Sequence, residues 1–538
     1  MNGASSLSMS RLDIAVVVAY LAGIVGLGLW AWKRRRTKQA SSAQYFLAGG
    51  TLRWPVIGLA LFSTNISTIH LVSLAQEGYV NGLAYGNFEW MAAFLLIVLA
   101  LFFAPFYIRA RVATLPDFLE KRYSRASRDW LAALSIISAV FIHIGFSLYT
   151  GAVVLRGLFG IDIMTSILVT ALLTGLYTVV GGLLAVVVTE SVQTVVLILG
   201  SACVLGFGLS RIGGWEGLVA AVEPVKLTVL RTAAETPSLP WYAVFLGYPI
   251  IGLWYWCADQ TIVQRVLGAK DERHARLGPL FAGFIKILPV FLFVLPGLIA
   301  YGLVRQGALP APESSADVYS LLVNNILPAG LKGIVAAALL AALMSTVSGA
   351  LNSIATLFTL DIYRRWRPQA TEKRLTLVGR VVTFAGMAVA ILWSPMISHF
   401  QSLFQGITAV ICYIAPPITA VFIWGVLWKR ASAAAARATL MAGSALGLVV
   451  FFLDWFKATT GWRVPPMMAT FYLFLICSAV LVVVSLLRPH AHTEESEKLV
   501  WKRPGDALKG AWGPGWLDFR LVALALFLAM VGLYAVFG

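Results

Sequence analysis

Charged residues are scarce in this sequence. Only 12% of its 538 residues are Asp, Glu, Lys or Arg, whereas about a quarter is usual in a soluble domain. Hydrophobic residues make up 59% of the chain, and the mean hydropathy is +0.83. This composition excludes an ordinary soluble protein and indicates an all-α integral membrane protein.

Other features that define common protein classes are also missing. The four cysteines lie inside apolar runs without metal-type spacing: Cys203, Cys257, Cys412 and Cys477. No G-x-x-x-x-G-K-[ST] loop occurs, so an ATP-driven pump would lack its phosphate cradle. The net charge of +17 comes from basic residues in the short segments between apolar runs. We therefore expect the lipid bilayer as a partner, and neither a nucleic acid nor an obligate protein partner.

Long apolar runs are abundant instead. Runs of about 20 residues mark membrane-spanning helices, and we expect fourteen: 13–32, 54–76, 82–108, 130–158, 162–179, 183–210, 241–264, 277–304, 332–360, 375–397, 401–428, 433–455, 465–487 and 518–537. Most of the Lys and Arg residues fall in alternate connecting segments, which predicts cytoplasmic basic loops and both termini outside. The basic run at 33–36 follows the first apolar run, so we expect a retained first helix in the cell membrane and not a cleaved signal.

The second expected helix is unusually polar. Its segment "FSTNISTIHLVSLAQEGY" (62–79) places many hydroxyl and amide groups at membrane depth. Because such side chains compete with the backbone for hydrogen bonds, we expect local unwinding near Asn65 that frees the carbonyls of Ser63 and Ile66. The alternative is an unbroken helix whose hydroxyls bond to its own backbone.

The seventh expected helix carries Gly247, Pro249 and Gly252 near its middle. Interrupted helices in corresponding places of two halves are typical of an inverted repeat with a binding site between them. The second and seventh helices are five apart, so the two halves would have opposite topology. The sequence therefore predicts two five-helix repeats and an interruption at these three residues.

Ionisable residues inside spans are candidates for function. Glu89 and Lys286 either hydrogen-bond a polyhydroxy solute or form a structural ion pair. Asp259 and Arg265 are expected to form a gate or anchor salt bridge. His143 stands alone among apolar residues and is expected to be a packed histidine. The Trp254-Tyr255-Trp256 cluster either belongs to an interfacial belt or, as we favour, stacks on a sugar face.

The stretch "MSTVSGALNS" (344–353) gathers small hydroxyl residues inside the ninth expected helix. Such residues serve close helix packing, or their oxygens bind a hard cation. At about 100° per residue, Ala342, Ser345 and Thr346 share one helix face. This agreement favours cation binding by that face.

Six segments together resemble the sodium:solute symporter family, and most closely its sodium/glucose cotransporter branch. They are "YFLAGG" (45–50), "NFEWMA" (87–92), "YTVVGGLLAVVVTESVQT" (177–194), "WYWCADQTIVQRVLGAK" (254–270), "LNSIATLFTLDIY" (351–363) and "APPITAVFIWGVLWKR" (415–430). The resemblance implies a LeuT-type core of five plus five helices, with one helix before it and three after. The expected organisation is a first helix and basic loop (1–50), the first repeat (51–210), an extracellular loop (211–240), the second repeat (241–430) and three further helices (431–538).

The resemblance also implies ligand sets for sodium. The first sodium would bind the carbonyls of Ser63, Ile66 and Ala342 and the hydroxyls of Ser345 and Thr346. A second sodium, known in some relatives, matches less well, because Glu190 replaces an Asp and Ser348 is followed by Gly349. We therefore expect one sodium per solute, with Glu190 and Ser348 as the residues of a possible second site.

The solute site that the resemblance implies matches the family pattern only in part. Residues at positions that line the sugar pocket or its aromatic gate are Asn65, His70, Glu89, Tyr255, Trp256, Lys286 and Thr408. Thr408 replaces a glutamine that binds sugar hydroxyls, and Gly252 replaces an asparagine of a bacterial galactose-transporting relative. Because of these departures, the alternatives to a hexose as the solute are a modified sugar, a polyol or a sugar acid.

The sequence thus predicts a sodium-coupled secondary active symporter that imports a sugar or a related polyhydroxy solute by alternating access, with sodium as its coupling ion. The alternatives are a sodium or proton symporter for another solute, such as an amino acid or monocarboxylate, or a non-transporting membrane sensor; a channel is a third class. We expect no enzymatic activity, because no nucleophile-base pair or metal cluster is evident at membrane depth.

Overall fold

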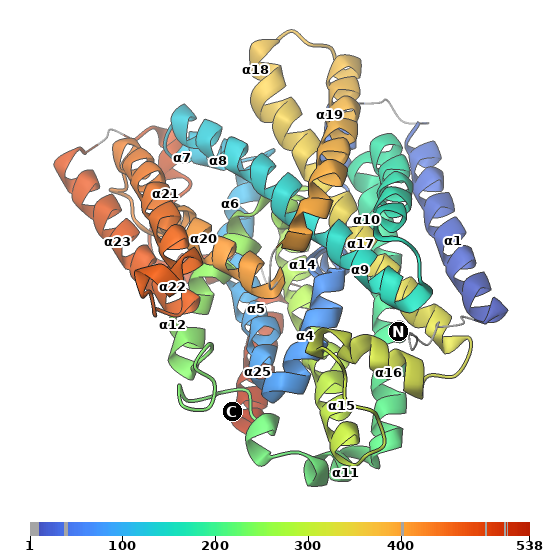
Figure 1. Cartoon of the computed structure of the whole chain (residues 1–538). Helices are drawn as coiled ribbons and strands as arrows, with labels where there is room; N and C mark the ends of the chain where they lie inside the picture. Colours follow the sequence, from blue (N-terminus) through green and yellow to red (C-terminus); the bar gives the residue numbers. More distant parts are fainter. Residues whose placement is uncertain (1–9, 37–40, 400–402, 490–491, 511–512, 514) are drawn as a thin grey trace.

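Helices make up most of the chain that the structure describes. The computed structural model describes residues 10–36, 41–399, 403–489, 492–510, 513 and 515–538 (Figure 1). Within these residues, eleven helical segments are long and apolar enough to cross a membrane. They are Arg11–Lys33, His70–Arg109, Arg125–Gly157, Ile163–Ile212, Glu272–Arg305, Leu331–Trp366, Glu372–Ile397, Val410–Leu427, Ala433–Trp455, Pro466–Leu487 and Phe519–Phe537. The expected multi-pass, all-α architecture is confirmed.

The described residues form the following helices in chain order. In the first part of the chain they are α1 (Arg11–Arg36), α2 (Ser42–Leu47), α3 (Trp54–Asn65), α4 (Thr68–Asn81), α5 (Asn87–Val98), α6 (Ala104–Arg109), α7 (Leu115–Arg122), α8 (Arg125–Ser138), α9 (Gly145–Phe159), α10 (Ile163–Ile212) and α11 (Gly214–Ala221). The middle part holds α12 (Trp241–Leu253), α13 (Gln260–Leu267), α14 (Glu272–Ile285), α15 (Leu295–Arg305), α16 (Val318–Ile326), α17 (Leu331–Leu357), α18 (Arg364–Trp366) and α19 (Glu372–Trp393). The last part holds α20 (Leu403–Leu427), α21 (Ala433–Trp455), α22 (Lys457–Thr460), α23 (Pro466–Leu487), α24 (Glu494–Glu497) and α25 (Phe519–Phe537). Residues 401 and 402 of the expected helix 401–428 lie outside the described residues.

The second expected helix is broken where its polar residues predicted. The backbone of Ile66 (φ −79°, ψ 105°) and Ser67 (φ −98°, ψ 172°) is extended and separates α3 from α4. Ser67 begins α4 as its N-cap, and the His70 ring completes a capping box by accepting a bond from the Ser67 N–H. The break is therefore held by side chains of the same polar segment.

The seventh expected helix is also broken, but not at the residues that we predicted. Gly247, Pro249 and Gly252 all lie inside the continuous helix α12, so that prediction is wrong. The helix widens into a π-helical segment at Trp254–Ala258, and the extended backbone of Asp259 then ends it. Asp259 accepts a hydrogen bond from the Ile262 N–H and begins α13 as its N-cap.

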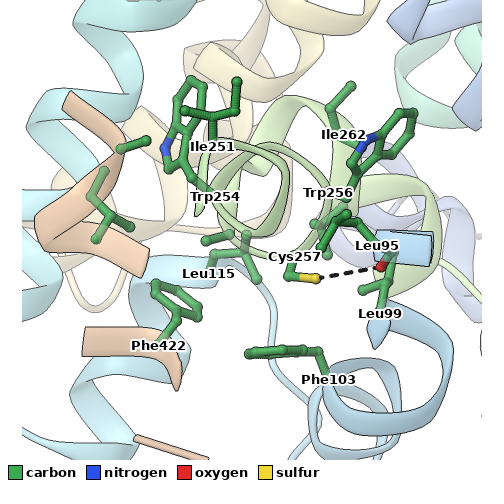
Figure 2. Packing of buried hydrophobic residues seen from close by; sticks show 14 of the residues in the cluster. Leu95, Leu99, Phe103, Leu115, Ile251, Trp254, Trp256, Cys257, Ile262 and Phe422 are labelled. Atoms are coloured by element: carbon green, nitrogen blue, oxygen red, sulfur yellow. Dashed lines mark hydrogen bonds between the residues drawn. The ribbon is translucent and has the colours of Figure 1, made fainter. Parts of the chain in front are cut away.

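Partners from neighbouring helices explain this location. The side chain of Thr419 on α20 donates to the Ile250 carbonyl (2.8 Å) and so joins α20 to α12 next to Pro249. The Tyr107 hydroxyl on α6 donates to the Cys257 carbonyl (2.6 Å), which the break leaves without its helical partner. Figure 2 shows Trp254 and Trp256 on either side of this turn, with Cys257 directed towards Leu95.

The expected division between 162–179 and 183–210 falls inside one long segment. Helix α10 runs from Ile163 to Ile212 but is kinked at Gly182, whose φ of 63° and ψ of −162° are not helical. A Cβ at Gly182 would lie 2.6 Å from the Tyr45 carbonyl oxygen. Glycine is therefore required both by the backbone angle and by the close approach of α2.

Helix α17 lies at the centre of the bundle. All of its residues from Val335 to Leu357 are buried, and it packs against α10, α1, α19 and α3. Figure 1 shows α18 and α7 at one end of the bundle and α11 at the opposite end, which we name the α18 end and the α11 end. The breaks at Ile66–Ser67 and at Asp259 lie close to this central helix. The candidate site lies between the two broken helices.

Candidate functional site

A cavity of about 160 Å³ lies between the two broken helices. A single water molecule needs roughly 10–15 Å³ by the same measure, so the cavity has room for a small solute. All residues that the sequence predicted for the solute site line it: Asn65, His70, Glu89, Tyr255, Trp256, Lys286 and Thr408. The structure thus brings together residues that are up to 343 positions apart in the chain.

Lys286 and Glu89 form an ion pair on the cavity wall, and their side chains are 1% and 2% exposed. Lys286 Nζ also donates to Asn65 Oδ1 (2.6 Å). Asn65 Nδ2 in turn donates to the Tyr255 hydroxyl (3.1 Å). The two alternatives for Glu89 and Lys286 are therefore compatible, because the residues pair with each other and still line the cavity.

Lys286 owes its position to the end of a helix. It is the C-cap of α14, and Pro289 follows three residues later and cannot donate a backbone hydrogen bond. An ammonium group offers three N–H donors. Since Glu89 and Asn65 occupy two of them, one remains for a solute oxygen.

The aromatic cluster divides between the cavity and the core. Tyr255 and Trp256 line the cavity, with their ring centroids 5.2 Å apart and nearly perpendicular. Lys286 Nζ lies 5.6 Å from the centre of the Trp256 ring. Trp254 is 3% exposed and packs in the hydrophobic core. The widened π-helical turn, a feature frequent at functional sites, rotates two of the three rings towards the cavity.

Four polar residues of the cavity wall are absent from the predicted sets: Ser67, His143, Ser147 and Tyr248. His143 lies in the π-helical segment that joins α8 to α9, and Ser147 lies in the first turn of α9. The His143 side chain is 9% exposed, its Nε2 has no hydrogen-bond partner, and this atom lies 3.5 Å from Asp259 Oδ2. The spacing of four residues between His143 and Ser147, which places both on one helix face, was the signal available in the sequence.

The prediction of a salt bridge between Asp259 and Arg265 is wrong, because each residue has a different partner. Arg265 pairs with Glu190 through Nη2–Oε1 (2.5 Å) and Nε–Oε2 (3.3 Å), whereas Asp259 faces His143. Six residues along a helix correspond to about 600° of rotation, so the two side chains leave α13 on different faces. Asp259 caps that helix instead.

The predicted sodium ligands converge between α3 and α17. Ser345 Oγ donates to the carbonyls of Ser63 (2.8 Å) and Ala342 (3.1 Å). Thr346 Oγ1 lies 3.2 Å from the Ala342 carbonyl and 3.2 Å from that of Thr64. Ile66 stands at the break itself, next to the end of α3.

These oxygen ligands fit a small hard cation. Carbonyl and hydroxyl oxygens are the ligand type that such ions prefer. The Ser63 hydroxyl is buried without a hydrogen-bond partner in the same place. Thr346 also lines the cavity, so this oxygen cluster and the cavity share a wall.

The residues of the possible second sodium site are engaged with other groups. Glu190 accepts from Thr64 Oγ1 (2.9 Å) in addition to Arg265, and Ser348 Oγ donates to the Ser345 carbonyl (3.0 Å). A Cβ at Gly349 would lie 2.4 Å from Arg265 Nη2. The guanidinium group therefore fills the space beside Gly349.

Gly252 has a comparable role in packing. A Cβ at this position would lie 2.9 Å from Leu95 Cγ and 3.0 Å from Tyr248 Cε1. The asparagine expected from the resemblance would therefore displace its neighbours. This accounts for the departure in steric terms.

Comparison with known proteins supports the same interpretation of the fold and of the class of protein. The model of the sodium:solute symporter family matches residues 45–443. The chain belongs to the sodium:solute symporter family. It is accordingly a multi-pass membrane transporter that couples solute movement to sodium, and not an enzyme.

Relatives in this family include two kinds of vertebrate cotransporter. The chain is 36% identical over 486 residues to sodium/myo-inositol cotransporter 2 of Mus musculus, covering 84% of this chain and 71% of the relative. It is 32% identical over 536 residues to sodium/glucose cotransporter 1 of Oryctolagus cuniculus, covering 91% of this chain and 81% of the relative. A solved outward-open structure of a Na⁺-coupled sialic acid symporter has the same fold (TM-score 0.78, 21% identity, 90% of this chain and 100% of that chain).

Proposed function

We propose that this symporter imports a sugar or a related polyhydroxy solute together with sodium by alternating access. The observation that carries the proposal is the double position of Thr346, which belongs to the oxygen cluster and lines the solute cavity. A change in the geometry of one site therefore acts directly on the other. Related proteins named as glucose and myo-inositol cotransporters support the solute class.

The proposed topology has fourteen transmembrane helices. The eleven continuous segments account for eleven of them. The two broken helices, α3–α4 and α12–α13, add two more, and the kink at Gly182 divides α10 into two helices. The LeuT-type core then consists of repeats 51–210 and 241–430, preceded by 1–50, separated by the loop 211–240 and followed by 431–538. The α11 end faces the outside, as do both termini, and the basic loops are cytoplasmic.

The proposed sodium site consists of the carbonyls of Ser63, Ile66 and Ala342 and the hydroxyls of Ser345 and Thr346. Two of its elements, α3 and α17, come from different repeats and would move relative to each other during transport. Sodium binding between them favours the conformation in which both are close together. We propose one sodium per solute, because Arg265 already balances the charge of Glu190 and Ser348 bonds within its own helix.

The proposed solute contacts follow from the hydrogen-bonding groups on the wall. Glu89 offers acceptors, Lys286 and His70 offer donors, and Asn65 and Thr408 offer both. Tyr255 and Trp256 supply an apolar face for the carbon skeleton of a ring. Alternating hydroxyls and C–H faces are the features of a sugar or cyclic polyol, so this set of groups supports that class.

Sodium dependence tests the function directly. Purified protein in liposomes should take up a hexose or inositol when an inward sodium gradient is imposed, with no further protein required. Linkage requires that sodium raises solute affinity and that solute raises sodium affinity by the same factor. Equal uptake and equal solute affinity after replacing sodium by potassium or choline would exclude the proposal, whereas a proton gradient that replaces sodium would favour proton coupling.

Thr346→Ala tests the sodium site. Loss of one hydroxyl ligand, worth about 1 kcal/mol, should raise the half-saturating sodium concentration about fivefold. Thr383→Ala is a matched control, because the buried Thr383 hydroxyl bonds only to Gly379 of its own helix, α19 (2.9 Å). Wild-type sodium dependence in Thr346→Ala would remove this residue from the site.

A further inference from the structure

The first residues of α17 are capped by a side chain from another helix. Gly330 precedes the helix with a φ of 90°, and a glycine offers no side chain to cap it. Instead, Asp13 Oδ1 on α1 accepts the backbone N–H groups of Gly330 (2.8 Å) and Gly333 (2.7 Å). These are donors that a helix N-terminus leaves free and that a local Asp or Ser normally satisfies.

The Asp13 carboxylate is fully engaged in this arrangement. Its Oδ2 accepts the backbone N–H (3.1 Å) and the hydroxyl (2.6 Å) of Ser10. The residue is 1% exposed, although α1 as a whole lies at the edge of the bundle (Figure 1). A carboxylate is favourable at this end of a helix because the N-terminus carries a partial positive charge.

Gly333 is required by the close approach of the α1 backbone, and Gly330 is required by its positive φ. A Cβ at Gly333 would lie 2.7 Å from Asp13 Cα and from the Asp13 carbonyl oxygen. A Cβ at Gly330 would lie 2.8 Å from Leu12 Cδ2. The sequence thus removes side chains from α17 at the two places where α1 contacts its first turn.

A second contact joins the same two helices closer to the proposed sodium site. Ile24 on α1 forms a buried cluster with Tyr177 on α10 and Met344 on α17, and the Tyr177 hydroxyl donates to the Met344 carbonyl (3.4 Å). Met344 directly precedes Ser345. Helix α1 therefore contacts α17 at its first turn and again beside the sodium ligands, which lie about 18 Å along the helix from Gly333.

We propose that Asp13 is a positioning residue for sodium binding: from α1, outside the region that the family model matches, it holds α17 so that Ala342, Ser345 and Thr346 face Ser63. The inference rests on the proposed function of these residues as sodium ligands. Loss of the cap loosens the first turn of α17 and shifts the ligands along or around the helix axis. The solute cavity is lined mostly by other elements and is affected less.

The experiment measures sodium-dependent uptake in liposomes for wild type, D13N and D13A. The half-saturating sodium concentration should rise about fivefold in D13A, in line with the loss of a helix cap, and less in D13N, which keeps one oxygen acceptor. The solute KM at saturating sodium should stay within about twofold. A purely structural cap would lower the amount of active protein without this separation of sodium and solute affinities.

Two controls separate the cap from general effects. S10A removes a partner of Asp13 but leaves its bonds to α17, and it should keep wild-type sodium affinity. D518N changes another buried N-cap Asp, which accepts the Arg520 N–H at the start of α25 (2.9 Å), and it should also leave sodium affinity unchanged.

The outcomes are distinct. Unchanged sodium affinity in both D13N and D13A, or loss of folded protein in both, overturns the role of Asp13 while the sodium dependence of wild type stands. A rise in half-saturating sodium that is equally large in S10A or D518N also overturns it. Sodium-independent uptake by wild type overturns the proposed function itself.

Discussion

Two buried ion pairs of the same chemical type bond to neighbouring residues at the end of α3, Thr64 and Asn65. Lys286–Glu89 and Arg265–Glu190 each join a base of the second proposed repeat to a glutamate of the first, and all four side chains are 2% exposed or less. Only the first pair lines the cavity. Burial and residue type therefore do not separate a binding group from a structural one.

The free hydrogen-bonding capacity of each pair does separate them. Both oxygens of Glu190 accept bonds from Arg265, and Thr64 adds a third. The guanidinium also donates to the Thr261 carbonyl and packs against Gly349. Lys286, by contrast, lines the cavity and uses only two of its three N–H donors on Asn65 and Glu89. The enclosed pair holds helices together, and the open pair can exchange partners with a solute.

Arg265→Ala should have the largest effect on stability. It leaves Glu190 buried without its counter-charge, which typically costs about 3–5 kcal/mol. We expect a strongly lowered unfolding midpoint of the purified protein. The double variant Glu190→Gln/Arg265→Gln should recover part of the loss, because both charges are removed together. If Arg265→Ala unfolds at the wild-type midpoint, the pair is not the enclosed anchor described above.

Lys286→Ala should act mainly on binding. The variant removes a charge-assisted donor, which corresponds to about 10- to 100-fold weaker solute affinity. Its effect on stability should be smaller than that of Arg265→Ala, because cavity water can solvate Glu89. Calorimetric titration with solute and thermal unfolding of the same samples measure both quantities. Glu89→Gln/Lys286→Gln should not restore solute affinity, and a restored affinity would contradict the assignment.

Thr64→Val should show whether the two ion pairs act independently, with a smaller loss of stability than Arg265→Ala. It keeps the shape and the backbone carbonyl of Thr64 but removes the hydroxyl bonds to Glu190 and to the Ala60 carbonyl, and we expect about 2 kcal/mol lower stability. Solute affinity should remain that of wild type, since the hydroxyl faces the enclosed pair. An unfolding titration and a binding titration provide the two values. A large drop in solute affinity would show that the two pairs are not independent.

Tyr255→Phe should have the smallest effect. The ring and its packing remain, while the hydrogen bond from Asn65 is lost. Solute KM should rise about two- to fivefold, with the unfolding midpoint unchanged. Uptake at saturating sodium provides the measurement, with Tyr107→Phe as a contrasting variant that removes a hydroxyl from the core at the second break.

The sequence predicted the features that depend on local chemistry. The hydroxyl and amide residues around Asn65 predicted the first break, and helical spacing predicted that Ala342, Ser345 and Thr346 share a face. The second break was misplaced, because Pro249 and its neighbouring glycines suggested an interruption, whereas α12 continues through all three residues. Asp259 was the better signal, as an N-cap residue that precedes a short apolar helix.

The features that depend on helix neighbours could not be predicted. Arg265 was paired with Asp259, an acid six residues away, whereas its partner Glu190 lies 75 residues away on α10. For His143, the spacing to Ser147 indicates a shared helix face, but not that this face lines the cavity, which depends on the widened turn between α8 and α9. To predict such pairings, one must know which sides of the helices contact each other.

The capping box at the start of α4 determines the direction of one hydrogen bond to the solute. Because His70 Nδ1 accepts the Ser67 N–H, the neutral ring carries its proton on Nε2 and offers the cavity a donor only. A solute atom that meets Nε2 needs a lone pair but no hydrogen. A fluorine that replaces the corresponding hydroxyl should therefore be tolerated, whereas removal of the oxygen altogether should not.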